Sequence, residues 1–152
     1  MRLLLLFFCL FIGPLAQASA TIKPVITIQT ATLPNGVTIW LNHDPRLPII
    51  SMHMTFLNTG AYQDRPDKAG QTSLMTQLLT EGAGQRDSQA FHAALDNAGI
   101  SLDFGTDRDH VFGAVYTTKE QSELAFSLLH DALNTPRLDA GDLNRLRAAG
   151  QA

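Results

Sequence analysis

The five histidines are the side chains of this sequence best suited to bind a metal or to move a proton near neutral pH. Two histidines on one helix bind zinc together when they are four positions apart, because both rings then lie on one face. The closest two histidines here are ten positions apart, from residue 43 to residue 53. We therefore expect solvated or hydrogen-bonded imidazoles rather than a metal site at His43, His53, His92, His110 and His130.

A turn near residue 107 gathers three carboxylates, those of Asp103, Asp107 and Asp109. A calcium loop needs a denser set of oxygen ligands and a glycine at a defined position, and Gly105 alone does not supply that pattern. We expect these aspartates to cap the turn and to be solvated, with a calcium site as the alternative.

Charge and cysteine content narrow the functional classes further. The formal net charge is −3 and the sequence has no basic patch, which argues against a nucleic-acid partner. The single cysteine, Cys9, lies in the apolar N-terminal segment. Without that segment the chain has neither disulfides nor cysteine metal ligands, as suits an oxidising compartment.

Residues 1–20 have the pattern of a signal peptide. Arg2 provides a positive start, residues 3–12 are apolar, and small residues offer cleavage sites after position 18 or 20. The apolar run is shorter than the roughly 20 residues that span a bilayer, which argues against the alternative of an N-terminal anchor. We expect residues 1–20 to be removed and residues 21–152 to lie in the periplasm, with no stable membrane anchor.

Hydrophobic periodicity predicts the elements that must position any site. Alternating apolar and polar residues predict strands at 25–33, 37–42, 49–57, 100–104 and 110–116. Apolar residues at helical spacing predict helices at 69–79 and 88–98, after residue 118 and after residue 139. This order predicts an α+β fold, with helices packed on one face of a mainly antiparallel sheet. We expect the strand at 49–57, with His53, inside that sheet.

The helix ends carry further predictions. Expected N-terminal caps are Ser88, Thr118 together with Gln121, and Asp139. Glu81 follows the first helix and is expected to be solvated, because an exposed position is usual for Glu. His92 is expected on the solvent side of the second helix. The last helix reaches residue 152 without a cap, which indicates a fragment truncated at its C-terminus.

An ordered set of short motifs resembles the insulinase, pitrilysin and mitochondrial processing peptidase family of inverted-motif zinc metallopeptidases. The matching segments run from about residue 30 to the end and include Leu33-Pro34-Asn35-Gly36-Val37, Gly60-Ala61-Tyr62, Lys68-Ala69-Gly70, Leu95-Asp96-Asn97-Ala98-Gly99-Ile100 and Leu138-Asp139-Ala140-Gly141-Asp142-Leu143. The resemblance implies that this chain is the first half of an αβ unit. In the family such units occur in tandem or as separate subunits and enclose a chamber that holds peptide.

The resemblance also implies where a metal site would lie. Zinc-binding members carry H-x-x-E-H on the first helix, in which two His bind the metal and the Glu is the general base. Aligned on Gly70, these positions are occupied by Ser73, Thr76 and Gln77. Hydroxyls and a carboxamide replace neither imidazole ligands nor a base near neutral pH. We therefore expect no catalytic residue, no bound cofactor and no metal in this chain.

Two further positions bear on this interpretation. A zinc-binding member would place its third ligand, a Glu, at or past Ala152. Active relatives carry an Asn that engages the substrate backbone in the strand near residues 101–106, and none is present there.

The sequence therefore predicts a non-catalytic member of this family, secreted to the periplasm. Its expected partners are a homologous subunit that carries zinc, with which it would enclose peptide, and the peptide or unfolded polypeptide itself. Two alternatives remain: an active zinc-dependent endopeptidase, and an envelope scaffold or assembly protein that uses the fold for packing alone.

Overall fold

The computed structural model describes residues 27–150, so the predicted signal peptide lies outside the described residues. These residues form two units, which divide between residues 44 and 45. The first unit contains an antiparallel hairpin of β1 (Ile28–Thr32) and β2 (Thr38–Asn42). Gly36 has a φ of 87°, which a side chain would disfavour, and its amide donates to the Leu33 carbonyl at 2.9 Å. This confirms the predicted turn, although β2 begins one residue later than expected.

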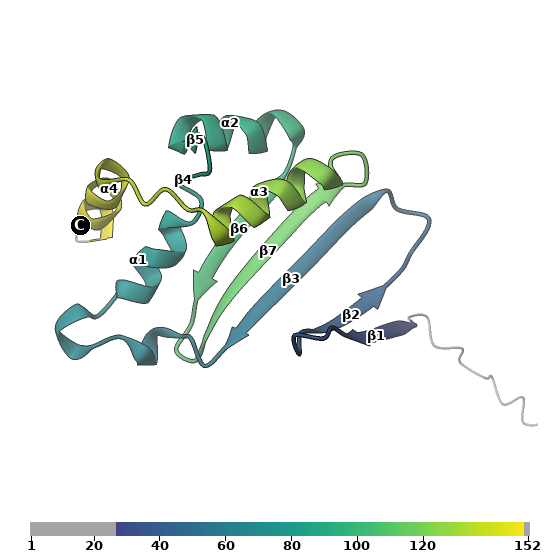
Figure 1. Cartoon of the computed structure of the whole chain (residues 1–152), viewed down its shortest axis with the longest axis horizontal. Helices are drawn as coiled ribbons and strands as arrows, with labels where there is room; N and C mark the ends of the chain where they lie inside the picture. The colour runs from purple at the N-terminus through teal and green to yellow at the C-terminus, as the bar shows by residue number, and fades with distance from the viewer. Residues whose placement is uncertain (1–26, 151–152) are drawn as a thin grey trace, which may run out of the picture. The chain divides into compact units, whose positions relative to one another are not determined.

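The second unit is built on one antiparallel sheet (Figure 1). Its strands are β3 (Ile49–Leu57), β6 (Ser101–Thr106) and β7 (His110–Thr118), in the order β3-β7-β6. All three were predicted, but β3 is an edge strand among the described strands, with β7 in the centre. The expectation that β3 lies inside the sheet is therefore wrong for this part of the chain. Alternation of side chains reports which face is covered, whereas it does not report how many neighbours a strand has.

Two helices, α2 (Ser88–Ala98) and α3 (Ser122–Asn134), cover one face of this sheet. Inward-facing residues of β6 and β7 pack against them, and Phe91 of α2 and Leu128 of α3 are fully buried. The other face of the sheet has no helix on it in the described structure, and Phe112 and Tyr116 are 44% and 48% exposed there. The predicted α+β architecture with helices on one face is confirmed.

The connection between the first two helices contains a feature that the periodicity did not predict. α1 (Gln71–Leu78) is followed by a short antiparallel hairpin whose two strands, β4 (Gly82–Ala83) and β5 (Arg86–Asp87), have two residues each. Gly82 has a φ of 106°, and a Cβ there would lie 2.9 Å from the Arg86 carbonyl oxygen. Strands this short carry no alternation from which they could be recognised.

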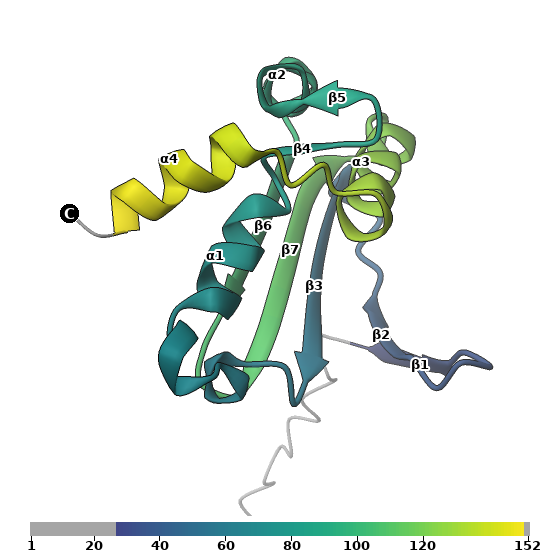
Figure 2. The same cartoon turned by 60° about the vertical axis from the view of Figure 1, so that its left-hand side comes forward.

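The remaining elements are two 3-10 turns, η1 (Ala61–Gln63) and η2 (Pro66–Lys68), and α4 (Ala140–Gly150). The chain between α3 and α4 is bound to β4, because the Arg137 amide donates to the Gly82 carbonyl at 3.0 Å. Figure 2 shows α4 beside the C-terminal end of α1. Within residues 27–150, no helix combines the length and the apolar character that a membrane crossing requires.

Two of the predicted helix caps are wrong. Asp87 rather than Ser88 caps α2, since its carboxylate accepts from the Ala90 amide at 2.8 Å. α3 begins at Ser122 and has no side-chain cap from Gln121, so the predicted capping box does not form. Polar residues cluster before each helix, and the backbone path decides which one reaches the free amides.

The third predicted cap, Asp139, does precede α4. Its carbonyl accepts from the Leu143 amide at 3.0 Å, while its carboxylate accepts from Arg137 at 2.8 Å. Its position at the helix start is therefore as predicted, although its side chain bonds to an arginine.

Candidate functional site

The site begins with the anchoring of α1, the helix that carries the motif positions. Gly70 precedes it in the left-handed conformation, with a φ of 88°. The Asp64 carboxylate accepts from the Gly70 amide at 2.8 Å, the Thr72 amide at 3.0 Å and the Thr72 hydroxyl at 2.5 Å. The hydrogen bond from the Thr72 hydroxyl is the main cause that lowers the pKa of Asp64. Asp64 therefore serves as the acidic cap at the positive end of α1.

Ser73, Thr76 and Gln77 lie on α1, and their polar atoms bond within the helix. Thr76 is 2% exposed, and its hydroxyl donates to the Ser73 carbonyl at 2.8 Å. Gln77 and Ser73 are exposed on one face, and the Gln77 amide nitrogen lies 3.2 Å from the same carbonyl and 3.4 Å from the Ser73 hydroxyl. This arrangement presents neutral hydrogen-bonding groups where a metal would need imidazole or carboxylate.

No group of three or more His, Cys, Asp or Glu within residues 27–150 is placed to hold a metal ion. The residues of α1 therefore do not fit a zinc ion.

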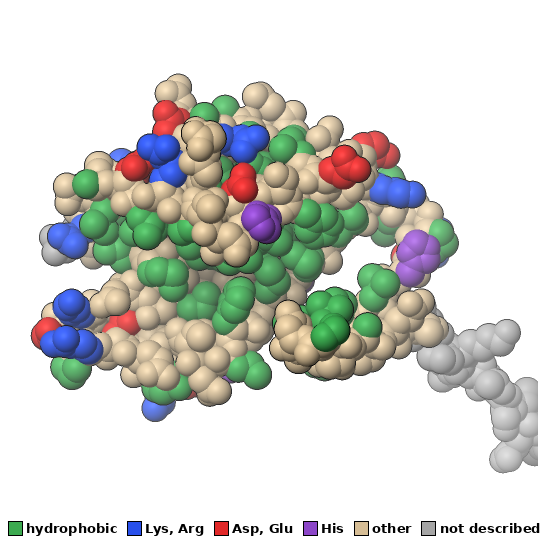
Figure 3. Space-filling view, viewed as in Figure 1, with side chains coloured by type: hydrophobic (Ala, Val, Ile, Leu, Met, Phe, Trp, Pro, Cys, Tyr) green, Lys and Arg blue, Asp and Glu red, His purple; other side chains and the backbone are tan. Residues whose placement is uncertain are grey.

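Ser73 and Gln77 line a groove of about 870 Å³ between the segment 67–78 and α4. Its apolar lining comes from Leu74, Met75, Leu78, Leu138, Leu143 and Leu146. Three charged residues, Asp67, Lys68 and Arg147, line it as well. Figure 3 shows the hollow at the left of the molecule, with apolar side chains between its upper and lower parts.

A buried carboxylate holds α4 in place at the C-terminal end of α1. Glu81 is 9% exposed, and its Oε2 atom lies 2.6 Å from the Arg145 guanidinium of α4 and 2.5 Å from the Ser88 hydroxyl of α2. Burial raises the pKa of Glu81, but the hydrogen bonds from Ser88 and Arg145 outweigh it and hold that pKa below its usual value. The expectation that Glu81 is solvated is therefore wrong. Its main partner follows 64 positions later (145 − 81), and no local pattern reveals such a contact.

His92 is a second residue of this cluster that the sequence did not reveal. Its side chain is 48% exposed, as expected for the solvent side of α2, yet its Nε2 atom lies 3.8 Å from the Glu81 carboxylate. Arg145 also lies 3.1 Å from Asp142 on α4. The cluster therefore joins the segment that follows α1 to α2 and to α4.

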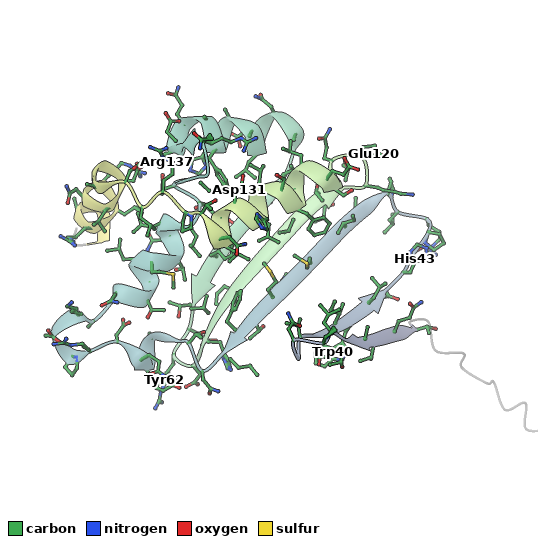
Figure 4. All side chains as sticks on the ribbon, viewed as in Figure 1. Trp40, His43, Tyr62, Glu120, Asp131 and Arg137 are labelled. Atoms are coloured by element: carbon green, nitrogen blue, oxygen red, sulfur yellow. The ribbon has the colours of Figure 1, made fainter. Side chains whose placement is uncertain are left out.

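The other predicted histidines lie apart from this site. His43 is exposed in the first unit (Figure 4), and His53 is exposed on the edge strand β3 rather than on a central strand. His110 lies 3.5 Å from Asp107, and His130 lies 3.6 Å from Asp131.

The predicted aspartates behave largely as turn residues. The Asp107 carboxylate accepts from the Asp109 and His110 amides, each at 2.7 Å, and the bond from His110 is the main cause that lowers its pKa. This confirms the capping role at Asp107. Asp103 lies on β6, where it accepts from the Ser101 hydroxyl at 2.8 Å.

Comparisons with known proteins agree with this fold. The profile described as insulinase, peptidase family M16, matches residues 39–151. The mitochondrial-processing peptidase subunit beta of Neurospora crassa is 23% identical over 122 residues, which are 80% of this chain and 25% of that protein. The same subunit of Saccharomyces cerevisiae is 24% identical over 119 residues, 78% of this chain and 26% of that protein. The chain thus spans about a quarter of the length of these relatives.

A solved structure shares the fold. The crystal structure of a peptidase M16 inactive domain from Pseudomonas fluorescens superposes with a TM-score of 0.73 at 20% identity and covers 81% of this chain and 30% of that one. Because the family profile covers most of the sequence, from β2 through α4, this chain belongs to the insulinase family of peptidases, family M16.

Proposed function

We propose that this chain is part of a non-catalytic family member that pairs with a homologous, zinc-bearing subunit and helps to enclose and hold peptide. The observation that carries the proposal is the sequence of α1, where alignment with zinc-binding members on Gly70 puts Ser73, Thr76 and Gln77 at the positions of the metal ligands and the base. The rest of the fold is that of the family.

The chemical argument concerns all three positions together. A single lost ligand can be replaced by a neighbouring side chain, but α1 contains no His, Asp or Glu from which a replacement could come. Supporting hydrogen bonds around a site cannot substitute for ligands that are absent. In the proposed pair, zinc belongs to the partner, whereas this chain contributes shape and strand edges to the chamber and needs no cofactor of its own.

The proposed location is the periplasm. The N-terminal pattern of a positive residue, an apolar run and a small-x-small site supports secretion across the inner membrane. The lack of cysteine beyond Cys9 suits an oxidising compartment.

Zinc content and peptidase activity test the proposal on the full-length protein. We expect near-zero zinc per chain by mass spectrometry and no peptide cleavage by the protein alone. We expect chelator-sensitive cleavage when it is combined with a homologue that carries an intact H-x-x-E-H. Full zinc occupancy and cleavage by the protein alone would establish the active-enzyme alternative, and failure to associate with any such homologue would favour the scaffold.

A further inference from the structure

We propose that the groove between α1 and α4 binds an apolar side chain of a polypeptide whose neighbouring residues are acidic. This rests on the proposed function, because it names the kind of peptide that the non-catalytic subunit holds. The position of the lost metal site would then be a side-chain pocket.

The lining of the groove is apolar and incompletely covered. Leu74, Leu143 and Leu146 are half-buried, and Met75 and Leu138 are 38% and 50% exposed. Side chains of this size gain free energy when a ligand removes them from water, at about 25 cal/mol per Å². The groove therefore favours an aliphatic side chain of leucine or methionine size.

Leu138 adds an independent observation. Its φ is 51°, the left-handed conformation that residues with a Cβ rarely adopt, and it directly precedes Asp139 at the start of α4. A glycine would adopt this conformation more readily. A half-exposed leucine in this conformation on the wall of a groove is the kind of backbone outlier that clusters at ligand-binding sites.

The charges at the groove determine the flanking residues of the peptide. Asp67 also lines the groove, but its carboxylate is paired with Arg65 through two contacts at 3.0 Å, and Arg145 is paired with Glu81. Lys68 and Arg147 have no carboxylate partner within residues 27–150. These two cations complement an acidic peptide.

The N-terminal end of α1, which is the other positively polarised group near the groove, already binds a carboxylate. The amides of Gly70 and Thr72 at the start of α1 donate to Asp64, so this helix end does not offer an open anion site. An acidic group of the peptide is therefore attracted to the two side chains and not to the helix.

The experiment measures binding of three fluorescent ten-residue peptides of Gly and Ser to the full-length protein paired with its zinc-bearing homologue, inactivated by a chelator. One peptide carries Leu flanked by two Glu, the second carries Leu flanked by two Lys, and the third carries Ser flanked by two Glu. We expect the first to bind tightest, the third to bind at least about tenfold more weakly, and the second about fivefold more weakly at low salt.

Two variants locate the site. Arg147→Glu should weaken binding of the acidic Leu peptide and strengthen binding of the basic Leu peptide. The matched charge reversal Lys119→Glu, on the turn between β7 and α3, should change neither affinity. Leu138→Gly should weaken both Leu peptides without lowering the thermal midpoint, because glycine relieves the strained φ. A loss of thermal stability without a loss of binding would give Leu138 a folding role and overturn its assignment to the groove.

The failures of the two proposals are distinguishable. If Arg147→Glu does not change the preference for the acidic over the basic Leu peptide, the groove assignment is overturned and the peptide-holding function remains intact. A pair that forms but binds none of the peptides would overturn peptide holding and the groove assignment together.

Discussion

The two helical regions of the larger unit are held by different forces. α2 and α3 lie on the sheet through fully buried residues such as Phe91 and Leu128, whereas α4 has no buried residue. α4 is held instead by the Glu81–Arg145 ion pair, the backbone bond from Arg137 to β4, and half-buried leucines that also line the groove. Apolar burial thus fixes the scaffold, while a charge cluster fixes the wall of the candidate site.

This difference separates the candidate site from the packed scaffold. On α1, Ser73 and Gln77 are exposed and face the groove rather than the packed core. Substitutions there leave the contacts of α2 and α3 with the sheet unchanged. The scaffold and the site can therefore change separately.

The largest expected effect is in the core. Phe91→Ala removes a fully buried ring and should lower the free energy of unfolding by about 3–5 kcal/mol, measured by urea denaturation. The matched change Phe126→Ala, at a side chain that is 40% exposed on α3, should cost about 1 kcal/mol. Equal losses for the two variants would contradict the view that burial at Phe91 fixes α2.

A smaller and more local effect is expected at the charge cluster. Glu81→Gln removes the ion pair with the exposed Arg145 and should cost about 1–3 kcal/mol, since the buried carboxylate that accepts from Arg145 and Ser88 loses its charge. Amide exchange should become faster in α4 and remain unchanged in α2 and α3. Glu120→Gln, on an exposed residue (Figure 4), is the control and should alter neither measurement.

The same carboxylate predicts a dependence of stability on pH. The pKa of Glu81 is lowered in the folded protein from its ordinary value of 4.5, so its contribution is complete above that value and is lost as the pH falls through the folded pKa. Arg145, His92 and the Ser88 hydroxyl face this group. The difference in unfolding free energy between the native protein and Glu81→Gln should therefore shrink as the pH falls below about 4.5. A difference that stays constant down to pH 2 would rule out this linkage.

The smallest effect is expected at the start of α1. Asp64→Ala removes the acceptor of the Gly70 and Thr72 amides and should cost about 1 kcal/mol, with faster amide exchange in the first turn of α1. Asp67→Ala in the same loop removes only an exposed pair with Arg65 and should cost about 0.5 kcal/mol or less. A larger loss of unfolding free energy for Asp67→Ala than for Asp64→Ala would contradict the assignment of Asp64 as the residue that stabilises the start of α1.

Most of the fold could be predicted because its main elements carry long periodic patterns. The strand at Ile49–Leu57 was predicted with its observed bounds, and α2 follows the predicted range 88–98. β4 and β5 were missed because two-residue strands have no period, and Ser88 was assigned as a cap although the backbone brings Asp87 to the free amide. Local rules identify candidates, and the chain path selects among them.

The sequence by itself determined the family resemblance and the absence of ligand-type side chains on α1, because residue identity and spacing are local properties. Tertiary structure alone decided that Glu81 is buried against Arg145 and that Leu138 and Arg147 share a groove with Ser73 and Gln77. These contacts join residues more than 60 positions apart. Only the packing of α4 beside α1 brings them within the few ångströms at which hydrogen bonds and apolar contacts act.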